Sequence, residues 1–453
     1  MSTKYKLESV RVKSESEGTW GASFDSMVSE VSIVESLDFP GIRATIVVND
    51  SISSYTKFKG DELLELVYTL PDLGQSKSYL FKVYRIGPIV KLEKKARYTI
   101  ECISQEAMLN ELSYVFGSFK NKKVSEIVKE ILTDSKKGFD MSSNGKELKI
   151  EETKDKFQCV IPGLRAFDAI NWVGSKAVRK DSKGSTLQSG FIFYENYDGF
   201  HFKSFDKIIE DALNFTEYTD RNKNKIRHPV YRYYPKRSTS DSVDVGVIES
   251  ISYPDVFNTS IAIRNGSFAG LYTTVALDVI PNSKYPTPKT DQKPYTGVAF
   301  KVTDLYGKQS HLGTENPYED GSQLPMYNRM RRNRMRGNMI HAWDAPDQNK
   351  LKLDTGVVTQ RTEETAIYTH CRKATFEAIK LNIRVAGNAA SHVGNPLTVE
   401  IPLNISDNRT TEMDKIYTGL YIIAGVRQHL SRDVLSTELV LVKDSLGSAT
   451  PST

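Results

Sequence analysis

The sequence has little cysteine and no long apolar run. Its 453 residues include only three cysteines, Cys102, Cys159 and Cys371. Isolated cysteines in odd number predict neither a disulfide framework nor a cysteine-rich zinc site, and they favour a reducing compartment. No segment approaches the roughly 18–20 apolar residues of a membrane-spanning helix, and the N-terminal residues lack the apolar core of a signal peptide. We expect a chain that is made and kept in the cytoplasm unless it travels inside a larger particle.

Metal-binding patterns are also missing. None of the seven histidines stands in an HxxxH, HxH or HExxH arrangement, so their spacing gives no sign of converging metal ligands. His370 and Cys371 are the one adjacent pair, but neighbouring residues on a helix diverge by about 100 degrees. We therefore predict structural roles for the histidines, with no metal and no cofactor.

The usual signatures of a catalytic nucleophile are absent as well. The sequence has no GxSxG motif and no GxxxxGK[ST] phosphate loop. Carboxylate pairs such as Glu151–Glu152 and Glu363–Glu364 stand among charged residues. A glycosidase needs one carboxyl group in an apolar pocket that raises its pKa, whereas these pairs are typical of solvated surfaces. We predict no catalytic residues and a protein that is not an enzyme.

The sharpest charge feature is a run of arginines. The chain as a whole carries a mild net charge of +5, which implies neither nucleic-acid nor membrane binding by itself. Arginine forks match phosphate oxygens, so the run is a candidate anion or partner patch. A solvated or intersubunit face that meets carboxylates is the favoured alternative, since no nucleic-acid motif surrounds the run. The run consists of Arg329, Arg331, Arg332, Arg334 and Arg336.

A second group of residues joins aromatic and basic side chains. Tyrosines beside lysine and arginine could stack on bases or sugars. A half-buried edge strand explains the same residues and is preferred. The group comprises Tyr231, Tyr233 and Tyr234 with Arg232, Lys236 and Arg237.

Strand patterns fill both ends of the chain. Hydrophobic content of 39% and charged content of 26% are ordinary for a globular protein, and the length allows two to four domains. Short β-rich runs bounded by turn residues predict a small barrel or sandwich near the N-terminus. The predicted strands there are Val28–Val34, Ile42–Val48, Leu63–Leu70, Tyr79–Val90 and Arg97–Ile103, and near the C-terminus Leu381–Val385, Leu397–Ile401, Tyr417–Gly425 and Leu435–Val442.

Helical patterns lie between these ends. Apolar residues at helical spacing run from Val124 to Leu132, which predicts one apolar stripe on a charged helix. Further predicted helices are Gln105–Leu112, one that follows Pro162-Gly163, and roughly Glu363–Lys380. We also expect a hairpin of Phe191–Tyr194 with Phe200–Phe205, an irregular segment from Asp134 to Phe157, and an extended proline-rich connector at 281–294.

Several of these segments together carry a family likeness. In segment order and pattern they resemble the central hub protein of the baseplate of T4-type contractile-tail phages, which is related to the hub half of type VI secretion spike proteins. The likeness covers most of the chain and is weakest from about Asn282 to Thr355. The segments are Tyr84–Leu112, Val115–Leu132, Pro162–Val178, Phe191–Ser204 and Ala378–Val442.

The resemblance implies an α+β, mainly β fold with two similar small β-barrels plus helix-containing insert domains. The first barrel would span 1–113, and the second would combine 247–278 with 374–445. Helix-containing outer domains would span 114–246 and 279–373, with a disordered tail at 446–453. The arginine run would decorate the outside.

The resemblance also implies a structural role in a viral tail. A homotrimer would form a ring that adapts the sixfold tail tube to the threefold central spike. Its axial channel would pass DNA without binding it specifically during genome ejection and host cell entry. The partners would be the tail tube or a tube-initiator protein, the spike protein and the surrounding baseplate wedge proteins. The protein would lie in the virion, in the tail baseplate, after assembly in the host cytoplasm.

Two alternatives remain open. One is a tail-associated hydrolase that acts on the cell wall, which would need convergent carboxylates or a metal triad. The other is a nucleic-acid-binding protein that uses the Arg329–Arg336 run. The sequence has no spike domain, no β-helix repeat and no lysozyme-like segment, so we expect the spike to be a separate polypeptide.

Overall fold

The structure is a computed structural model of the 453-residue chain. It describes residues 3–14, 18–60, 62–91, 93–134, 141, 146–154, 156–182, 187–220, 223, 225–233, 246–254, 260, 266–267, 269–275, 295–318, 336–338, 362–403 and 413–447. Among these residues, no helix is long and apolar enough to cross a membrane.

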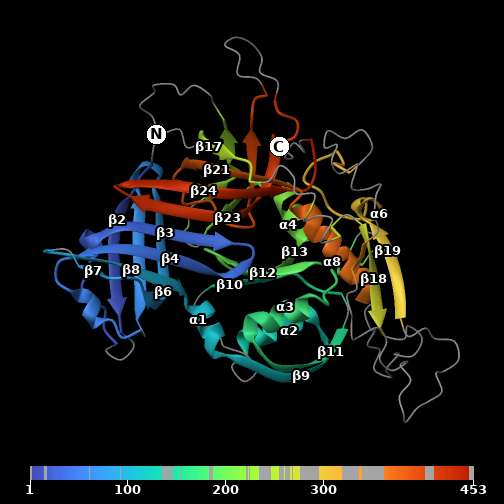
Figure 1. The fold of residues 1–453 in the computed structure, drawn as a ribbon, viewed down its shortest axis with the longest axis horizontal. Helices are drawn as coiled ribbons and strands as arrows, with labels where there is room; N and C mark the ends of the chain where they lie inside the picture. The colour runs from blue at the N-terminus through green and yellow to red at the C-terminus, as the bar shows by residue number, and fades with distance from the viewer. Residues whose placement is uncertain are drawn as a thin grey trace.

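A 14-stranded sheet dominates the fold (Figure 1). Its pairings are antiparallel except for the one between β16 and β22. Along the main path the strands are β17 (Ile248–Ser252), β21 (Ile379–Ala386), β24 (Val434–Lys443), β23 (Gly419–Ser431), β3 (Val28–Ser36), β4 (Phe39–Asp50), β8 (Ala96–Ser104), β6 (Gln75–Ile86), β5 (Leu63–Leu70) and β2 (Lys6–Lys13). Off this path lie β1 (Thr3–Lys4) beside β24, β7 (Val90–Lys91) beside β8, β22 (Pro396–Glu400) beside β23, and β16 (Val230–Arg232) beside β22.

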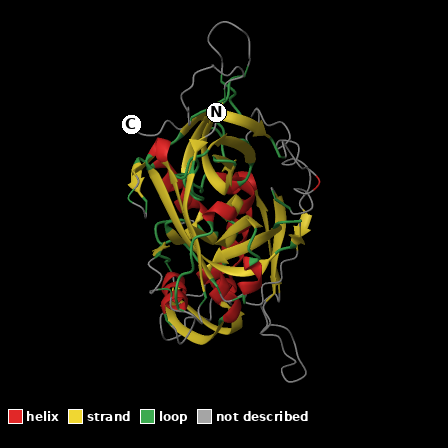
Figure 2. Ribbon diagram, turned by 90° about the vertical axis from the view of Figure 1, so that its left-hand side faces the viewer, coloured by secondary structure: helices red, strands yellow, loops and turns green. Residues whose placement is uncertain are grey.

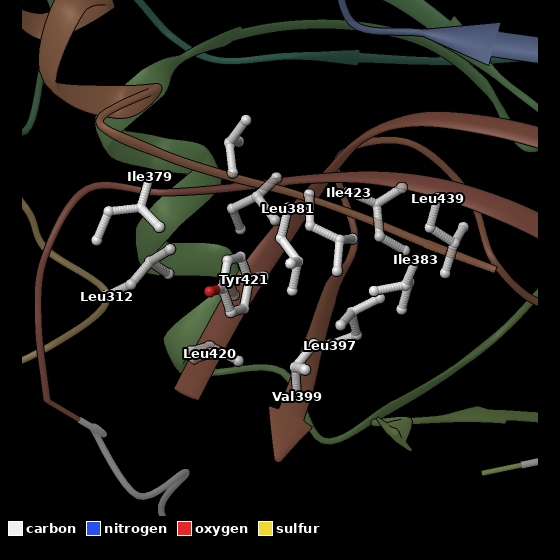
Figure 3. Packing of buried hydrophobic residues seen from close by; sticks show 14 of the residues in the cluster. Leu312, Ile379, Leu381, Ile383, Leu397, Val399, Leu420, Tyr421, Ile423 and Leu439 are labelled. Carbon is white, nitrogen blue, oxygen red and sulfur yellow. The ribbon is translucent and has the colours of Figure 1, made fainter. Parts of the chain in front are cut away.

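Two hydrophobic cores lie along this sheet. The N-terminal core gathers the buried side chains of β2 to β6 and β8, and the C-terminal core gathers those of β17 and β21 to β24 with helix α4 (Phe205–Leu213). In β21, alternate residues Ile379, Leu381 and Ile383 belong to the C-terminal core (Figure 3). Successive side chains of a strand point to opposite faces, so this alternation leaves the other face of β21 to polar residues.

Strand β23 belongs to both cores. Its first half pairs with β22 and its second half pairs with β3, and a register shift between Ile423 and Gly425 separates the two. A bulge of this kind bends a strand and increases its twist. Tyr421 accordingly lies in the C-terminal core, whereas Leu430 lies in the N-terminal core. The two halves of the sheet are therefore joined by one continuous strand.

A third core lies in the helix-containing insert. Helices α2 (Val124–Thr133) and α3 (Ala166–Gly174) pack against a two-stranded ribbon and a three-stranded sheet. The predicted apolar stripe of α2, from Val124 to Leu132, is buried. The ribbon consists of β9 (Tyr114–Lys123) and β11 (Lys156–Arg165), the sheet consists of β10 (Glu147–Ile150), β13 (Gly199–Ser204) and β12 (Phe191–Asn196), and α1 (Gln105–Leu112) precedes the ribbon.

The remaining elements are short or peripheral. A second three-stranded sheet packs beside the long helix α8 (Thr362–Phe376). In Figure 2 most helices lie in the central and lower part of the molecule, with strands above them and along both sides. The elements not yet named are β14 (Glu217–Thr219), β15 (Lys225–Arg227), β18 (Ala269–Val275), β19 (Tyr295–Lys301), β20 (Arg336–Asn338), α6 (Val302–Tyr306), and the 3₁₀ turns η1 (Asp25–Met27), η2 (Ser54–Lys57) and η3 (Pro71–Leu73).

The α+β, mainly β class predicted from the sequence is confirmed. Several local predictions are corrected. Phe205 was expected at the end of a strand but begins α4, because Ser204 caps the helix by accepting a hydrogen bond from the backbone N–H of Lys207. The segment from Asp134 to Phe157, expected to be irregular, contains β10 and the start of β11.

The strands within the span expected for the second barrel belong to two different sheets. Within 247–278, β17 joins the long sheet, whereas β18 pairs with β19 and β20 in the separate sheet. Leu446 was expected in a disordered tail, but it is buried and bridges to Glu315. Residues 448–453 and the proline-rich connector at 281–294 lie outside the described residues.

Candidate functional site on the long sheet

The long sheet turns a polar face away from its two cores. In β4, Ile42, Ala44 and Ile46 are buried, whereas the alternate residues Arg43 and Thr45 are exposed. Strands such as β3, β8 and β21 show the same alternation, which follows from the two-residue period of a strand. The polar face therefore extends from one edge of the sheet towards the other.

Cross-strand ion pairs cover this face. Each pair joins neighbouring strands, and each carboxylate lies against a basic side chain. Directly opposed or diagonal opposite charges stabilise a sheet modestly, and exposed pairs contribute little beyond that. The pairs are Arg11–Glu65 (2.8 Å) on β2 and β5, Arg85–Glu101 (3.3 Å) on β6 and β8, His429–Glu30 (3.6 Å) on β23 and β3, Arg427–Glu438 (3.5 Å) on β23 and β24, and Arg384–Glu249 (3.5 Å) on β21 and β17.

Arginine side chains in the middle of the face are partly neutralised. Register places Arg384 opposite Glu438, and Glu438 opposite Arg427. Arg427 in turn lies opposite Val34, which lies opposite Arg43. The Arg43 guanidinium lies 4.0 Å from the centre of the Phe39 ring. Such alternation of signs gives a hydrated surface with a weak field, rather than a concentrated anion site.

Buried charges hold the insert behind the sheet. Glu195 on β12 is fully buried, and its carboxylate accepts hydrogen bonds from the Ser104 hydroxyl at 2.6 Å and the Ile42 backbone N–H at 3.2 Å. Lys146 pairs with both Glu195 and Glu106. Burial raises the pKa of Glu195, and the neighbouring Lys146 ammonium opposes this shift. Residues of the N-terminal half and of the insert thus share one charge network.

A second network joins four segments at the meeting point of the two halves. Lys77 on β6 donates to Asp220 at 2.8 Å and to His392 Nε2 at 3.0 Å. The other ring nitrogen of His392 lies 3.1 Å from Glu35 on β3. Burial lowers the pKa of Lys77, and the hydrogen bond to Asp220 opposes this. Because Lys77 occupies Nε2, the imidazole is held as the tautomer that donates from Nδ1 to Glu35.

A third network anchors α8 to the end of β24. Arg372 is fully buried and lies 3.0 Å from Asp444 and 3.4 Å from Asp206. His311 lies 2.9 Å from Asp444, and the Tyr368 hydroxyl donates to Asp206 at 2.8 Å. Burial alone would raise the pKa of Asp444, but His311 and Arg372 together hold it at about 2.

Most of the arginine run predicted from the sequence falls on residues that the structure does not describe. Arg329, Arg331, Arg332 and Arg334 lie outside the described residues. Arg336 is the first residue of β20, opposite Gly270 of β18 in the separate sheet. The run stays a prediction without a structural test.

The aromatic and basic group resolves as an edge strand. Tyr231 on β16 is buried, and its hydroxyl accepts a hydrogen bond from Asn388. Arg232 pairs with Glu400 on β22. The preferred strand interpretation is therefore confirmed for this part, and Tyr234, Lys236 and Arg237 lie outside the described residues.

The adjacent pair His370 and Cys371 and the carboxylate pair Glu151–Glu152 make contacts that are typical of structural residues. His370 Nε2 lies 3.0 Å from the Gly266 carbonyl oxygen, whereas the buried Cys371 belongs to an apolar cluster with Tyr272 and Phe300. Glu152 pairs with exposed lysines, as expected for a solvated face. The expectation for Glu151 was wrong, since Glu151 pairs at 2.7 Å with Arg179, whose side chain is almost entirely buried. In the part of the chain that the structure describes, no group of three or more His, Cys, Asp or Glu residues could hold a metal ion.

The sheet-face residues escaped sequence reasoning. Their signal was present in part, because alternating charged residues between buried ones mark the exposed side of each strand. What the sequence does not show is which strands are neighbours. Glu30 and His429, for example, stand 399 positions apart and meet only because β3 pairs with β23.

Comparisons with known proteins bear on the fold. No family model matches the chain, and no curated protein matches it. Among solved structures, a prophage MuSo2 tail protein of 43 kDa from Shewanella oneidensis is similar, with 10% identity, a TM-score of 0.52, and coverage of 97% of this chain and 99% of that one. A tail protein from Neisseria meningitidis aligns with 14% identity and a TM-score of 0.51, covering 97% of each chain. At these identities the likeness shows the fold alone.

A more distant match concerns a secretion apparatus. A type VI secretion system component of E. coli aligns with 11% identity over 99% of this chain and 79% of that one, and its TM-score of 0.41 is too low to support an argument. The two tail proteins suffice for the conclusion. The chain has the fold of phage tail proteins, as its resemblance to the baseplate hub family predicted.

Proposed function

We propose that the chain is a structural hub subunit of a contractile tail. Three copies would form a ring that adapts the sixfold tail tube to the threefold central spike and leaves an axial channel for the genome. The tail-protein fold supports a structural role in a tail. The threefold ring, the axial channel and the position in the baseplate go beyond the fold and are part of the proposal.

The observation that carries the proposal is the order of strands around the β3–β23 junction. On one side stand the β3–β4 hairpin and then β8, and on the other stand the β23–β24 hairpin and then β21. Each side thus presents a hairpin flanked by a third antiparallel strand. Two comparable halves in one chain allow three chains to present six similar units, which is what a sixfold tube requires.

The polar face fits the wall of a channel for DNA. Duplex DNA is a dense polyanion, so an unpaired basic wall would bind it tightly and in a salt-dependent manner. Here the carboxylates Glu30, Glu65, Glu101, Glu249 and Glu438 each lie beside a basic group. A wall of paired charges stays hydrated and lets DNA pass without specific binding.

The domain plan follows from the same proposal. The first β module would be 1–113, and the second would combine 247–278, which joins the long sheet through β17 and not through β18, with 374–445. Residues 114–246 and 279–373 would form the outer domains. The tube or a tube initiator, the spike and the wedge proteins would bind to different parts of this frame. The role is non-catalytic, and the three charge networks serve to hold the modules in fixed positions.

The mass of the purified chain in solution tests the proposal. A ring subunit at high concentration should form a particle of three times the 51.0 kDa chain mass. If the chain alone stays smaller, the measurement is repeated with the spike protein added. A strictly monomeric chain in both conditions contradicts the ring. Turnover of peptidoglycan by the pure chain, abolished by one carboxylate substitution, would support a hydrolase instead.

A further inference from the structure

The ribbon of β9 and β11 has apolar residues on both of its faces. It lies at the lower rim of the molecule in Figure 1, away from the long sheet. On one face Val115 is buried in the core that contains α2 and α3. On the other face Phe116 is 69% exposed and Val160 is 67% exposed. An antiparallel ribbon covered on one side usually carries polar residues on the other. The apolar residues on the second face therefore indicate that another molecule packs against it.

The exposed apolar residues form one contiguous patch. Phe116 lies opposite Pro162, and Val160 lies two positions from Pro162 on the same strand. Diagonal neighbours at this spacing touch when the side chains are large. Tyr114, 56% exposed, precedes Phe116 on the same face, and Leu112, 75% exposed, ends α1 beside it. Side chains of this size and exposure amount to an apolar area on the order of 500 Å², the size of patches that are often functional.

The patch is fixed in shape. A Cβ atom on Gly163 would lie 2.6 Å from the Phe116 ring, so the ring rests directly on the Gly163 backbone. Gly163 also has a φ of +86°, which favours glycine. One side of the Phe116 ring is therefore supported by the backbone of β11, which limits the positions open to the ring.

Two exposed lysines lie at one end of the ribbon. Lys120 is exposed on the same face of β9, and Lys156 is exposed at the same end of the ribbon. At the other end Arg165 pairs with Glu111 at 2.9 Å. Two copies that met through this face would bring like charges together, which disfavours association. The charge pattern instead fits a partner with carboxylates beside its apolar side chains.

The ribbon offers its face rather than its edge. Pro162 lies within β11 and has no N–H to donate to an added strand. A proline inside a strand makes that strand less suited to pairing with further strands. Packing of a helix or sheet onto the exposed face does not depend on strand pairing.

We propose that the patch of Leu112, Tyr114, Phe116, Val160 and Pro162 is the docking face for a second tail polypeptide, one whose contact surface places apolar side chains beside Asp or Glu. The inference rests on the proposed function, because it requires that the chain assembles within a tail. It adds to that function a surface for a partner other than a second copy of the chain.

Hydroxyl-radical footprinting of the isolated chain and of the assembled tail particle tests this inference. We expect oxidation of Tyr114 and Phe116 to fall on the order of tenfold in the particle, as in the dry centre of an interface. Trp172, 37% exposed on α3 of the same insert, serves as the internal reference. Equal oxidation of Tyr114 and Phe116 in both samples overturns the proposal.

Two mild variants complete the test. Leu112→Ser and Val160→Ser remove apolar surface without disturbing Phe116, and Ile89→Ser, at a position 42% exposed outside the ribbon, is the matched control. We expect both ribbon variants to keep the oligomeric mass of the wild-type chain and to lose incorporation into tails. A change in oligomeric mass would instead make the ribbon a contact between copies and overturn the proposal. If the wild-type chain forms no trimers, either alone or mixed with the spike protein, that result contradicts the proposed ring but not the docking face. Failure of the ring and failure of the docking face can therefore be told apart.

Discussion

At the scale of single residues, buried side chains tie the two halves of the sheet together. Leu430 on β23 is fully buried in the N-terminal core, although its strand begins in the C-terminal core. The Tyr68 hydroxyl of β5 donates a hydrogen bond to Gln428 of β23. These contacts make the stability of one half depend on residues from the other end of the chain.

Leu430→Ala should therefore destabilise the whole protein. Removing a fully buried leucine side chain costs about 2–5 kcal/mol through lost burial and the cavity left behind. Urea unfolding of the variant and of Val440→Ala, a position 42% exposed on the same hairpin, measures the difference. The control should change the free energy of unfolding by less than about 0.5 kcal/mol. A similar loss in both variants would argue against a shared core at Leu430.

The pKa of Asp444 gives a pH-dependent prediction. Its value of about 2 in the folded protein lies below the ordinary value of an aspartate. A depressed carboxyl pKa stabilises the folded state above the unfolded pKa and loses this contribution as the pH falls through the folded pKa. Roughly 2 kcal/mol should therefore disappear between about pH 4 and pH 2.

Asp444→Asn isolates this contribution. It leaves Arg372 buried without its carboxylate partner, so it should destabilise the protein at pH 7 by about 3–5 kcal/mol. The difference from wild type should shrink as the pH falls from about 4 to 2. Glu438→Gln, an exposed pair on the sheet face, is the control with little expected effect. A difference that stays constant with pH contradicts the ionic role of Asp444.

At the scale of elements, the turn between β23 and β24 sets the hairpin at the junction. It consists of Arg432 and Asp433, with φ of 52° and 63°. A two-residue hairpin loop with both φ values positive prefers Asn-Gly over these residues. The double variant Arg432→Asn and Asp433→Gly should therefore raise the free energy of unfolding by about 0.5–1 kcal/mol.

Thermal unfolding of this double variant checks the turn. The single variant Arg432→Ala keeps a residue that disfavours positive φ and is the control, with little expected change in stability. A lower melting temperature for the Asn-Gly variant than for wild type would mean that the turn is not of this type.

Helices and strands could be predicted from the sequence where the spacing of apolar residues alone indicated the type of element. The stripe from Val124 to Leu132 indicated α2, and alternation from Leu381 to Val385 indicated β21. Phe205 was predicted to end a hairpin strand, whereas Ser204 caps a helix that begins at Phe205. The pairing of β23 with β3 and the Arg372 network could not be predicted, since both depend on residues hundreds of positions apart.

At the scale of the whole molecule, the proposal that the sheet face lines a channel makes a prediction about DNA binding. Its basic side chains are offset by carboxylates on neighbouring strands. Removing the carboxylates should leave a basic surface that binds polyanions. The triple variant Glu30→Gln, Glu101→Gln and Glu438→Gln should bind duplex DNA with an affinity that falls steeply as salt rises.

Electrophoretic mobility or anisotropy titrations at several salt concentrations measure this effect. A control with the same change in net charge carries Glu111→Gln on α1, and Glu126→Gln and Glu152→Gln in the insert. Wild type and control should both bind weakly compared with the sheet-face variant. Equal binding by the two triple variants would show that net charge, and not the face, controls DNA contact.

The central claim is that each chain supplies two comparable β units to a threefold ring. Averaged electron-microscope images of the assembled particle, viewed along its axis, test this most directly. The account predicts a threefold ring with six similar densities around an open centre, two from each chain. A ring with one such density per chain, or a closed centre, would contradict it.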